Sequence, residues 1–261
     1  MYFCTFDEIK HRIENLDKVF LHIKNPQTCI VKTFPYFVDD RQGNLAKYAR
    51  GKDYHIVILE KLSEIIANFK QDYPNNEFVS YCDISPLPEV YIAYKSGAGI
   101  LGRNGLIFDE IYGGYVFIGI ILTDANLNFE KSEKKTCINC KKCEISCPQK
   151  AIDANGVNPT KCLSYITQEM SADIDNLDNS RYIWGCDICL DVCPMNKNIQ
   201  KTDILEFKTN LISTLSLSDV ENLTRKELKN RFPERAFTFK GAKPLTRNLK
   251  LKASLKNINK A

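Results

Sequence analysis

The chain has 261 residues, of which 44% are hydrophobic, so it is long enough to bury one large core or two smaller ones. Its longest apolar run, Tyr115–Leu122, is far too short to cross a bilayer and predicts a core strand instead. The opening residues contain no cationic stretch followed by an apolar one, so we expect a cytoplasmic protein without a membrane partner. In such a reducing compartment, eleven cysteines favour metal ligation over disulfides.

The net charge of +4 is unevenly distributed along the chain. Residues 225–261 contain twelve Lys and Arg residues against two acidic ones, a net charge of +10, which leaves −6 for the rest of the chain. A basic segment joined to an acidic body predicts a polyanionic partner. A solvated helix surface has the same composition, so both interpretations stay open here.

Helices and strands are predicted to alternate over the first half of the chain. Thr5–Glu8 has the sequence of a capping box, and the apolar residues after it recur at helical spacing up to Phe20. Ser85 and Pro86 have the pattern of an N-cap and a first helical residue, which predicts a helix that ends near Lys95. The other predicted elements are a helix at 54–69 and strands at 29–38, 77–84, 105–109 and 115–123, with a turn at 113–114 between the last two. This alternation predicts an α/β domain.

The stretch "GAGILG" at 97–102 matches the G-x-G-x-x-G pattern of dinucleotide-binding folds. In those folds a strand leads into the glycines and a helix follows them, so that the helix N-terminus faces the pyrophosphate. Here the predicted order is reversed, with a helix before Gly97 and a strand after Asn104. The glycines are therefore predicted to form a helix C-cap and a backbone that lies close to a ligand.

A polar connector at 124–136 leads into the second half of the chain, where most of the cysteines lie. An acidic loop is predicted at 171–180. A second capping box, Thr224–Glu227, predicts a short helix in the basic segment.

Two cysteine motifs carry the strongest chemical signal. The first, "CINCKKCEISCP" at Cys137–Pro148, has the C-x2-C-x2-C-x3-C-P spacing of bacterial ferredoxins, in which the fourth cysteine ligates the other cluster. The second, "CDICLDVCP" at 186–194, repeats the end of this pattern, and its leading cysteine is displaced to Cys162. The crossover rule then predicts two 4Fe–4S clusters, one held by Cys137, Cys140, Cys143 and Cys193 and the other by Cys147, Cys162, Cys186 and Cys189.

Zinc is the alternative ligand for these cysteines. Structural zinc sites usually take two C-x2-C pairs separated by a spacer, whereas three closely spaced cysteines and a proline after each fourth cysteine favour a cubane. The three remaining cysteines, Cys4, Cys29 and Cys82, are predicted to be buried as small apolar residues.

Several segments together resemble one family. "YARGKDYHIVILEKL", "DISPLPE", "GAGILGRNGLI", "CINCKKCEISCPQKAI", "CLSYITQE" and "GCDICLDVCPMN" occur in the order seen in epoxyqueuosine reductases, the cobalamin-dependent, double-cluster enzymes of tRNA queuosine synthesis. The closing "FKGAKPLTRNLKL" also resembles the family's segment after the clusters, so the likeness extends from about Cys29 to Leu251.

The resemblance implies a fold of mixed α+β or α/β class in three consecutive parts. Residues 1–130 would form an α/β domain for cobalamin and substrate, residues 131–200 a ferredoxin-like domain with both 4Fe–4S clusters, and residues 201–261 a basic helical segment. The implied activity is the reduction of epoxyqueuosine to queuosine in tRNA. The implied partners are a tRNA anticodon stem-loop and an external one-electron donor.

The resemblance also implies roles for individual residues. Asp83 of "D-x-x-P" would be the acid that protonates the epoxide oxygen, and donation at neutral pH would require burial against a ligand to raise its pKa. His55 of "DYH" is either a second donor or a structural histidine. The residues expected near the cofactor are Gly97, Gly99, Gly102, Arg103, Asn104, Ser164, Tyr165 and Thr167.

The sequence also differs from the family pattern. Family members have a longer segment before the strand at 29–38, and part of that segment contributes to the wall of the cofactor site. Leu101 and Met195 replace tryptophans, and Arg103 replaces a lysine. Two alternatives remain: a corrinoid reductase that acts on a small molecule, for which the basic segment has no obvious use, and an iron–sulfur electron carrier without a corrin.

Overall fold

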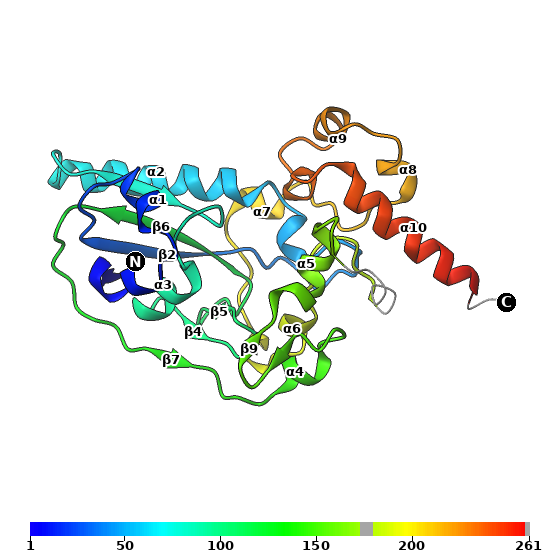
Figure 1. The fold of residues 1–261 in the computed structure, drawn as a ribbon, viewed down its shortest axis with the longest axis horizontal. Helices are drawn as coiled ribbons and strands as arrows, with labels where there is room; N and C mark the ends of the chain where they lie inside the picture. The colour runs from blue at the N-terminus through cyan, green and yellow to red at the C-terminus, as the bar shows by residue number, and fades with distance from the viewer. Residues whose placement is uncertain (173–179, 259–261) are drawn as a thin grey trace. The chain divides into compact units, whose positions relative to one another are not determined.

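The computed structural model describes residues 1–172 and 180–258, so the predicted acidic loop at 171–180 lies almost entirely outside the described residues. The chain folds into two compact units (Figure 1). The first unit contains Met1–Pro35, His55–Asn139 and Asn198–Gln200, and the second contains Tyr36–Tyr54, Cys140–Lys197 and Lys201–Ala261. This division differs from the three consecutive parts expected above, because each unit is assembled from separate stretches of the chain.

The first unit is built on a four-stranded sheet. Its strand order is β1 (Tyr2–Thr5), β2 (Thr28–Pro35), β6 (Val116–Thr123) and β3 (Phe78–Tyr81). Every neighbouring pair in this sheet is antiparallel, so the unit is of α+β class rather than a parallel α/β domain. The alternation of helices and strands predicted the elements but not their direction, because β6 inserts between β2 and β3 and runs opposite to both.

Helix α2 (Tyr54–Asp72) lies against the sheet at Gly119 of β6. A Cβ atom added at Gly119 would lie 2.7 Å from the ring of Phe34 and 3.1 Å from Ile58 and Leu62 of α2. The absence of a side chain at Gly119 therefore allows the helix to approach the strand closely.

The predicted helix over residues 5–20 is wrong. The capping box between Thr5 and Glu8 is present, but it opens only a 3-10 turn, Phe6–Glu8, and the α-helical part is α1 (Leu16–Phe20). The apolar residues that produced the helical spacing, Ile9 and Ile13, are buried in the core below the sheet. Tertiary packing thus outweighed the local pattern.

The helix predicted from Ser85 begins later. Helix α3 (Glu89–Lys95) has Pro88 at its N-cap. Ser85 does not cap it, because its hydroxyl accepts a hydrogen bond from the Leu87 N–H at 3.2 Å and donates to the Glu89 side chain. The predicted C-cap is confirmed: Gly97 has φ +75°, and the N–H groups of Gly97 and Ala98 donate to the carbonyls of Tyr94 and Ala93.

A second, three-stranded sheet has the order β5 (Ile107–Phe108), β4 (Ile100–Leu101) and β7 (Lys135–Thr136). The predicted strands at 105–109 and 115–123 are therefore in different sheets. The turn between them is closed by an isolated bridge between Asp109 and Gly113.

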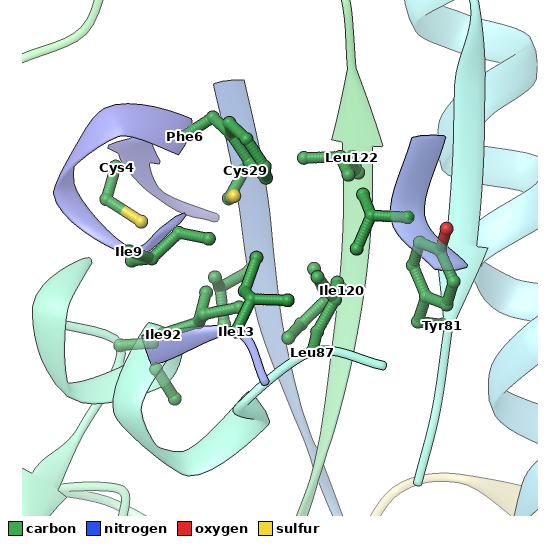
Figure 2. Packing of buried hydrophobic residues seen from close by; sticks show 14 of the residues in the cluster. Cys4, Phe6, Ile9, Ile13, Cys29, Tyr81, Leu87, Ile92, Ile120 and Leu122 are labelled. Atoms are coloured by element: carbon green, nitrogen blue, oxygen red, sulfur yellow. The ribbon is translucent and has the colours of Figure 1, made fainter. Parts of the chain in front are cut away.

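Buried apolar residues from β1, β2, β6 and the turns around α1 form the core of the first unit (Figure 2). Cys4 and Cys29 face each other across β1 and β2 and are 1% and 0% exposed, and Cys82 is 5% exposed. The prediction that these three cysteines are buried is confirmed.

The second unit consists of short helices. They are α4 (Lys142–Ser146), α5 (Leu163–Gln168), α6 (Ile188–Asp191), α7 (Leu205–Lys208), α8 (Leu217–Val220), α9 (Arg225–Arg231) and α10 (Ala242–Ile258), with a small hairpin of β8 (Ile152–Asp153) and β9 (Gly156–Val157). The capping box predicted at Thr224–Glu227 opens α9 as expected. None of the helices among the described residues is long and apolar enough to cross a membrane.

The basic segment contributes to the core of the second unit. Leu228, Phe237 and Leu245 have no exposed surface and pack in the same apolar cluster as Trp184. Residues 225–258 are therefore an integral part of this unit, and their charged side chains cover its surface.

Shortening a buried side chain of strand β6 tests the core of the first unit. Ile120 of β6 is fully buried, so Ile120→Ala should lower the free energy of unfolding by about 2–5 kcal/mol, because it removes apolar contacts and leaves a cavity. Leu21→Ala is the matched control, since Leu21 is 82% exposed and should change stability by less than about 0.5 kcal/mol. Urea unfolding followed by circular dichroism gives both values, and equal effects would contradict the assigned core.

Candidate iron–sulfur and catalytic sites

The first cysteine motif begins where the small sheet of the first unit ends. Cys137 follows β7, and its N–H donates to the carbonyl of Leu101 at 3.0 Å. The second unit contains the other three cysteines of this motif, Cys140, Cys143 and Cys147. Cys143 lies in α4, and Cys147 is the C-cap of that helix. The Ala151 N–H donates to the sulfur of Cys147 at 3.3 Å, the kind of contact that tunes the potential of a cluster.

The second motif gathers its cysteines around α6. Cys162 is the N-cap of α5, Cys189 lies in α6, and Cys186 precedes that helix. Burial raises the pKa of the Cys186 thiol, and the negative charges of Cys189 and Cys162 raise it further. These three predicted ligands of one cluster therefore lie near one another.

The eight motif cysteines differ from the three in the core. They are partly buried or exposed, whereas all three core cysteines are buried. Accessible thiolates are the donors that iron–sulfur clusters require, so this set of residues fits the predicted cofactor. Within residues 1–172 and 180–258, no three His, Cys, Asp or Glu side chains form a group that would hold a single metal ion.

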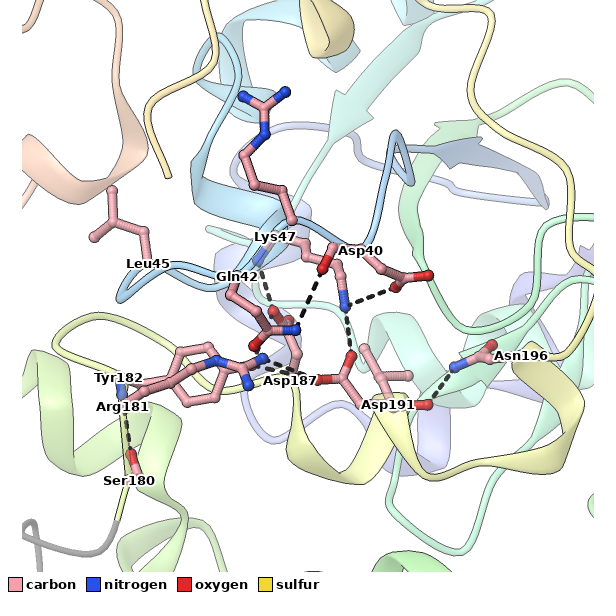
Figure 3. Close-up of polar contacts among 12 residues, drawn as sticks. Asp40, Gln42, Leu45, Lys47, Ser180, Arg181, Tyr182, Asp187, Asp191 and Asn196 are labelled. Atoms are coloured by element: carbon pink, nitrogen blue, oxygen red, sulfur yellow. Dashed lines mark hydrogen bonds and ion pairs between the residues drawn. The ribbon is translucent and has the colours of Figure 1, made fainter. Parts of the chain in front are cut away.

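A buried lysine orders the helix that carries Cys189 (Figure 3). The ammonium group of Lys47 is 2.5 Å from Asp191 and 3.6 Å from Asp40, and the Lys47 backbone N–H donates to Asp187 at 2.7 Å. The Lys47 side chain is only 7% exposed. Burial raises the pKa of Asp187 to about 6, although the backbone N–H and the charge of Lys47 oppose the shift.

Two further side chains complete this network. Arg181 lies 3.2 Å from Asp191, and its guanidinium stacks over the ring of Tyr182 at 4.7 Å. The Tyr182 hydroxyl donates to Asp187 at 3.4 Å. The role of Lys47 was not predicted from the sequence, in which the available signal was a single lysine among the apolar and aromatic residues at 45–49.

Asp83 lies in the first unit, in the loop that follows β3. Its side chain is 61% exposed, and its carboxylate lies 3.3 Å from Nε2 of His55 near the start of α2. The structure thus brings together Asp83 and His55, two residues that the sequence separates by a helix and a strand. An exposed carboxylate beside an imidazole is available to a ligand as a proton donor or acceptor.

Close internal contacts explain the glycines of the 97–102 loop. Cβ atoms added at Gly97, Gly99 and Gly102 would lie 2.5 Å from Ser132, 2.3 Å from Ile107 and 2.4 Å from Asn104. These glycines are therefore required by packing within the unit, whatever else they contact. Next to them, a cavity of about 240 Å³ is lined by residues 97–100, 109–111 and 132–133, with Tyr2 and Lys135.

Asn104 is the loop residue whose chemistry points to a ligand. It is 7% exposed, and its Nδ2 amide group has no hydrogen-bond partner among residues 1–172 and 180–258. A buried donor without a partner is rare in folded proteins, and an acceptor on a bound molecule would satisfy it. The amide oxygens on the rim of a corrin are such acceptors, so Asn104 fits the cofactor that the resemblance implies. Arg103 donates to the side chain of Asn139 at 2.9 Å.

The three predicted cofactor residues of α5 have unequal surroundings. Thr167 is fully buried, and its hydroxyl donates to the Ser164 carbonyl and accepts from the Gly185 N–H, both at 3.0 Å. Tyr165 is 39% exposed. Thr167 therefore stabilises the fold next to Cys186, whereas the Tyr165 ring is accessible. These residues belong to the second unit, and the glycine loop belongs to the first.

An α+β unit followed by paired ferredoxin-type cysteine motifs defines a two-cluster iron–sulfur protein. Residues 136–196 match the family model "4Fe-4S double cluster binding domain", which confirms the prediction of two 4Fe–4S clusters over zinc. Residues 21–84 match the model "Epoxyqueuosine reductase QueG, DUF1730". The chain is 34% identical to the epoxyqueuosine reductase of Atelocyanobacterium thalassa over 81% of its own length and 71% of that protein. The chain belongs to the epoxyqueuosine reductase family.

Other relatives define how far this likeness extends. The epoxyqueuosine reductases of Synechocystis and Lactococcus garvieae are 35% and 30% identical, and the chain spans 61% and 62% of their lengths. The solved epoxyqueuosine reductase of Streptococcus thermophilus matches 96% of this chain with a TM-score of 0.79 at 24% identity, and the chain covers 76% of it. An epoxyqueuosine reductase solved with an epoxyqueuosine-modified tRNA-Tyr stem loop gives a TM-score of 0.81 with the same identity and coverage. Both solved structures have the same fold as this chain.

Loss of the Lys47 charge tests the network around α6. Lys47→Met should lower the free energy of unfolding by about 3 kcal/mol, because it leaves the carboxylates of Asp187 and Asp191 without their buried cation. Arg231→Met removes the exposed ion pair with Asp219 in the same unit and should cost less than about 1 kcal/mol. Anaerobic denaturant titration of cluster-loaded protein measures both, and a Lys47 variant as stable as the Arg231 variant would contradict this role.

Proposed function

We propose that the protein reduces the epoxide of epoxyqueuosine in tRNA to give queuosine, with cobalamin as the reactive cofactor. The observation that carries the proposal is the presence in one chain of a double-cluster segment and an Asp83 loop in a family of epoxyqueuosine reductases. The reaction takes two electrons and two protons, breaks both carbon–oxygen bonds of the epoxide and releases water. Bound cobalamin would supply a strongly reducing nucleophile for this step.

The residues of the chain would supply electron transfer, proton transfer and contacts to the cofactor. The two clusters would pass electrons, one at a time, from an external one-electron donor. Asp83 would give a proton from its carboxyl group to the epoxide oxygen, and His55, 3.3 Å away, would help to return a proton to it. Asn104 would donate a hydrogen bond to the cofactor through Nδ2.

A tRNA anticodon stem-loop is the proposed partner, and it accounts for the basic segment. Arg225, Lys226 and Lys229 lie on the exposed face of α9, where they are placed to contact phosphates. Other basic residues of the segment have structural contacts instead: Arg231 pairs with Asp219 at 3.0 Å, and Arg247 donates to the carbonyls of Ile166 and Glu169. A tRNA substrate would also place the protein in the cytoplasm.

Replacement of the proposed acid tests the reaction. Asp83→Asn should lower the rate of queuosine formation by about 10²–10⁴-fold, because the side-chain amide has no acidic proton to transfer, while iron content and affinity for the modified stem-loop stay unchanged. Asp72→Asn is the control, since it removes an exposed carboxylate of the same unit. Nucleoside mass spectrometry after digestion of the tRNA measures the product. An Asp83→Asn variant with full activity would remove Asp83 from the mechanism.

Paired cysteine variants test the proposed crossover of ligands. Cys147→Ser should reduce iron from about eight to about four atoms per chain, and adding Cys189→Ser should cause little further loss, because both residues are assigned to the same cluster. Cys147→Ser combined with Cys140→Ser should remove both clusters. Iron and sulfide analysis of anaerobically reconstituted protein gives the counts, and the reverse pattern would refute the crossover.

A further inference from the structure

The loop after β3, residues 82–88, holds Asp83 in an unusual backbone conformation. Asp83 has φ +63°, in the left-handed region that residues other than glycine adopt only where their surroundings impose it. The Ile84 N–H donates to the Cys82 carbonyl at 2.7 Å, and the Ser85 N–H donates to the Asp83 carbonyl at 2.9 Å. The loop therefore turns tightly around Asp83, its single acidic residue.

The carboxylate of Glu89 lies inside this loop and accepts hydrogen bonds from two of its residues. The Ser85 hydroxyl donates to Oε1 of Glu89 at 2.9 Å, and the backbone N–H of Asp83 faces the same carboxylate closely enough to lower its pKa. Glu89 is the first residue of α3, so its backbone is fixed by a helix that packs against the core. The Glu89 side chain thus connects the loop around Asp83 to helix α3.

The charges around Glu89 link its ionisation to the loop. Burial raises the pKa of Glu89, the hydrogen bonds from Asp83 and Ser85 lower it, the charge of Asp83 raises it and that of His55 lowers it. Ionised Glu89 is the stronger acceptor, so the loop is held most firmly above this raised pKa. As the pH falls through that value, protonation weakens both hydrogen bonds.

We propose that Glu89 is a positioning residue for the proton donor: its carboxylate holds the Asp83 N–H and the Ser85 hydroxyl and so aims the Asp83 side chain. This inference rests on the proposed function for its catalytic consequence, because it assigns Asp83 the role of acid. The hydrogen-bonded arrangement itself is a property of the first unit alone and is testable without turnover.

The first experiment follows the backbone amide of Asp83 by NMR in the full-length, cluster-loaded protein labelled with ¹⁵N. The Asp83 amide should move with pH as Glu89 titrates, since the shift of an amide proton follows the charge of its acceptor. In Glu89→Gln the part of this titration that belongs to Glu89 should disappear, and the amide should lie near its low-pH position in that respect, because glutamine is an uncharged acceptor at every pH; the contributions of the Asp83 carboxyl and of His55 should remain. Glu64→Gln on the exposed face of α2 should leave the titration unchanged.

The second experiment measures epoxide reduction. Glu89→Ala should lower kcat by about 10–10²-fold through misplacement of Asp83, with the Kd for the modified stem-loop changed less than about twofold. Glu89→Gln should recover most of the lost rate, which a role in proton transfer by Glu89 itself would not permit.

Two results would overturn the proposal. One is an Asp83 amide whose pH titration is the same in the wild type and in Glu89→Gln, and the other is a Glu89→Ala variant with the same Asp83 amide shift and the same kcat as the wild type. A wild-type protein that binds its clusters but does not reduce the epoxide would refute the proposed function alone, since the amide titration would still decide whether Glu89 holds the loop.

Discussion

The second unit depends on the burial of Lys47 between carboxylates of the segment that carries Cys186 and Cys189. A buried ammonium group is tolerated only where anions surround it, and Asp191 of the ligand-bearing helix and Asp40 supply them. Asp187, at the N-cap of that helix, accepts the backbone N–H of Lys47. The same contact explains why residues 36–54 leave the first unit. This segment supplies the cation that fixes the orientation of α6, and a cluster ligand must be oriented before it can bind iron.

Backbone contacts secure the segment 36–54 around this lysine. The Leu45 N–H donates to the Ser213 carbonyl and the Ala46 N–H donates to the Trp184 carbonyl, both at 3.0 Å. Gly43 approaches Ser213 so closely that a Cβ atom would lie 2.2 Å from its carbonyl oxygen. The part of the ferredoxin-type motifs that lies in the second unit is thus supported both by chain that precedes it and by residues around Ser213 that follow it.

The proposed acid depends on a different kind of constraint. Asp83 is exposed and sits in a strained loop, whereas the groups that hold it, Ser85 and Glu89, are partly buried. An exposed donor on a fixed loop meets the two requirements of general acid catalysis, access to the substrate and a defined direction. The glycine loop in the same unit differs, since its glycines are required by internal packing and the buried Asn104 amide has no partner in the described part of the chain.

The sequence by itself determined the features that depend on local spacing. The cysteine motifs predicted two clusters, the long amphipathic pattern predicted α2, and the glycine after Lys95 predicted a helix C-cap, because ligand spacing, helical periodicity and backbone handedness are all encoded within a few residues. The prediction for Cys4, Cys29 and Cys82 also succeeded, since cysteines outside a metal motif behave as small apolar residues.

Only the tertiary structure decided the features that depend on contacts between distant residues. The antiparallel order β1-β2-β6-β3 follows from the insertion of β6 between two earlier strands, and no local pattern specifies that choice. The capping box at Thr5 gave a single turn, because burial of Ile9 and Ile13 beneath the sheet outweighed helix propensity. The pairing of Asp83 with His55 and the burial of Lys47 against α6 likewise join residues that are far apart in the chain, and their energy comes from desolvation that exists only in the folded protein.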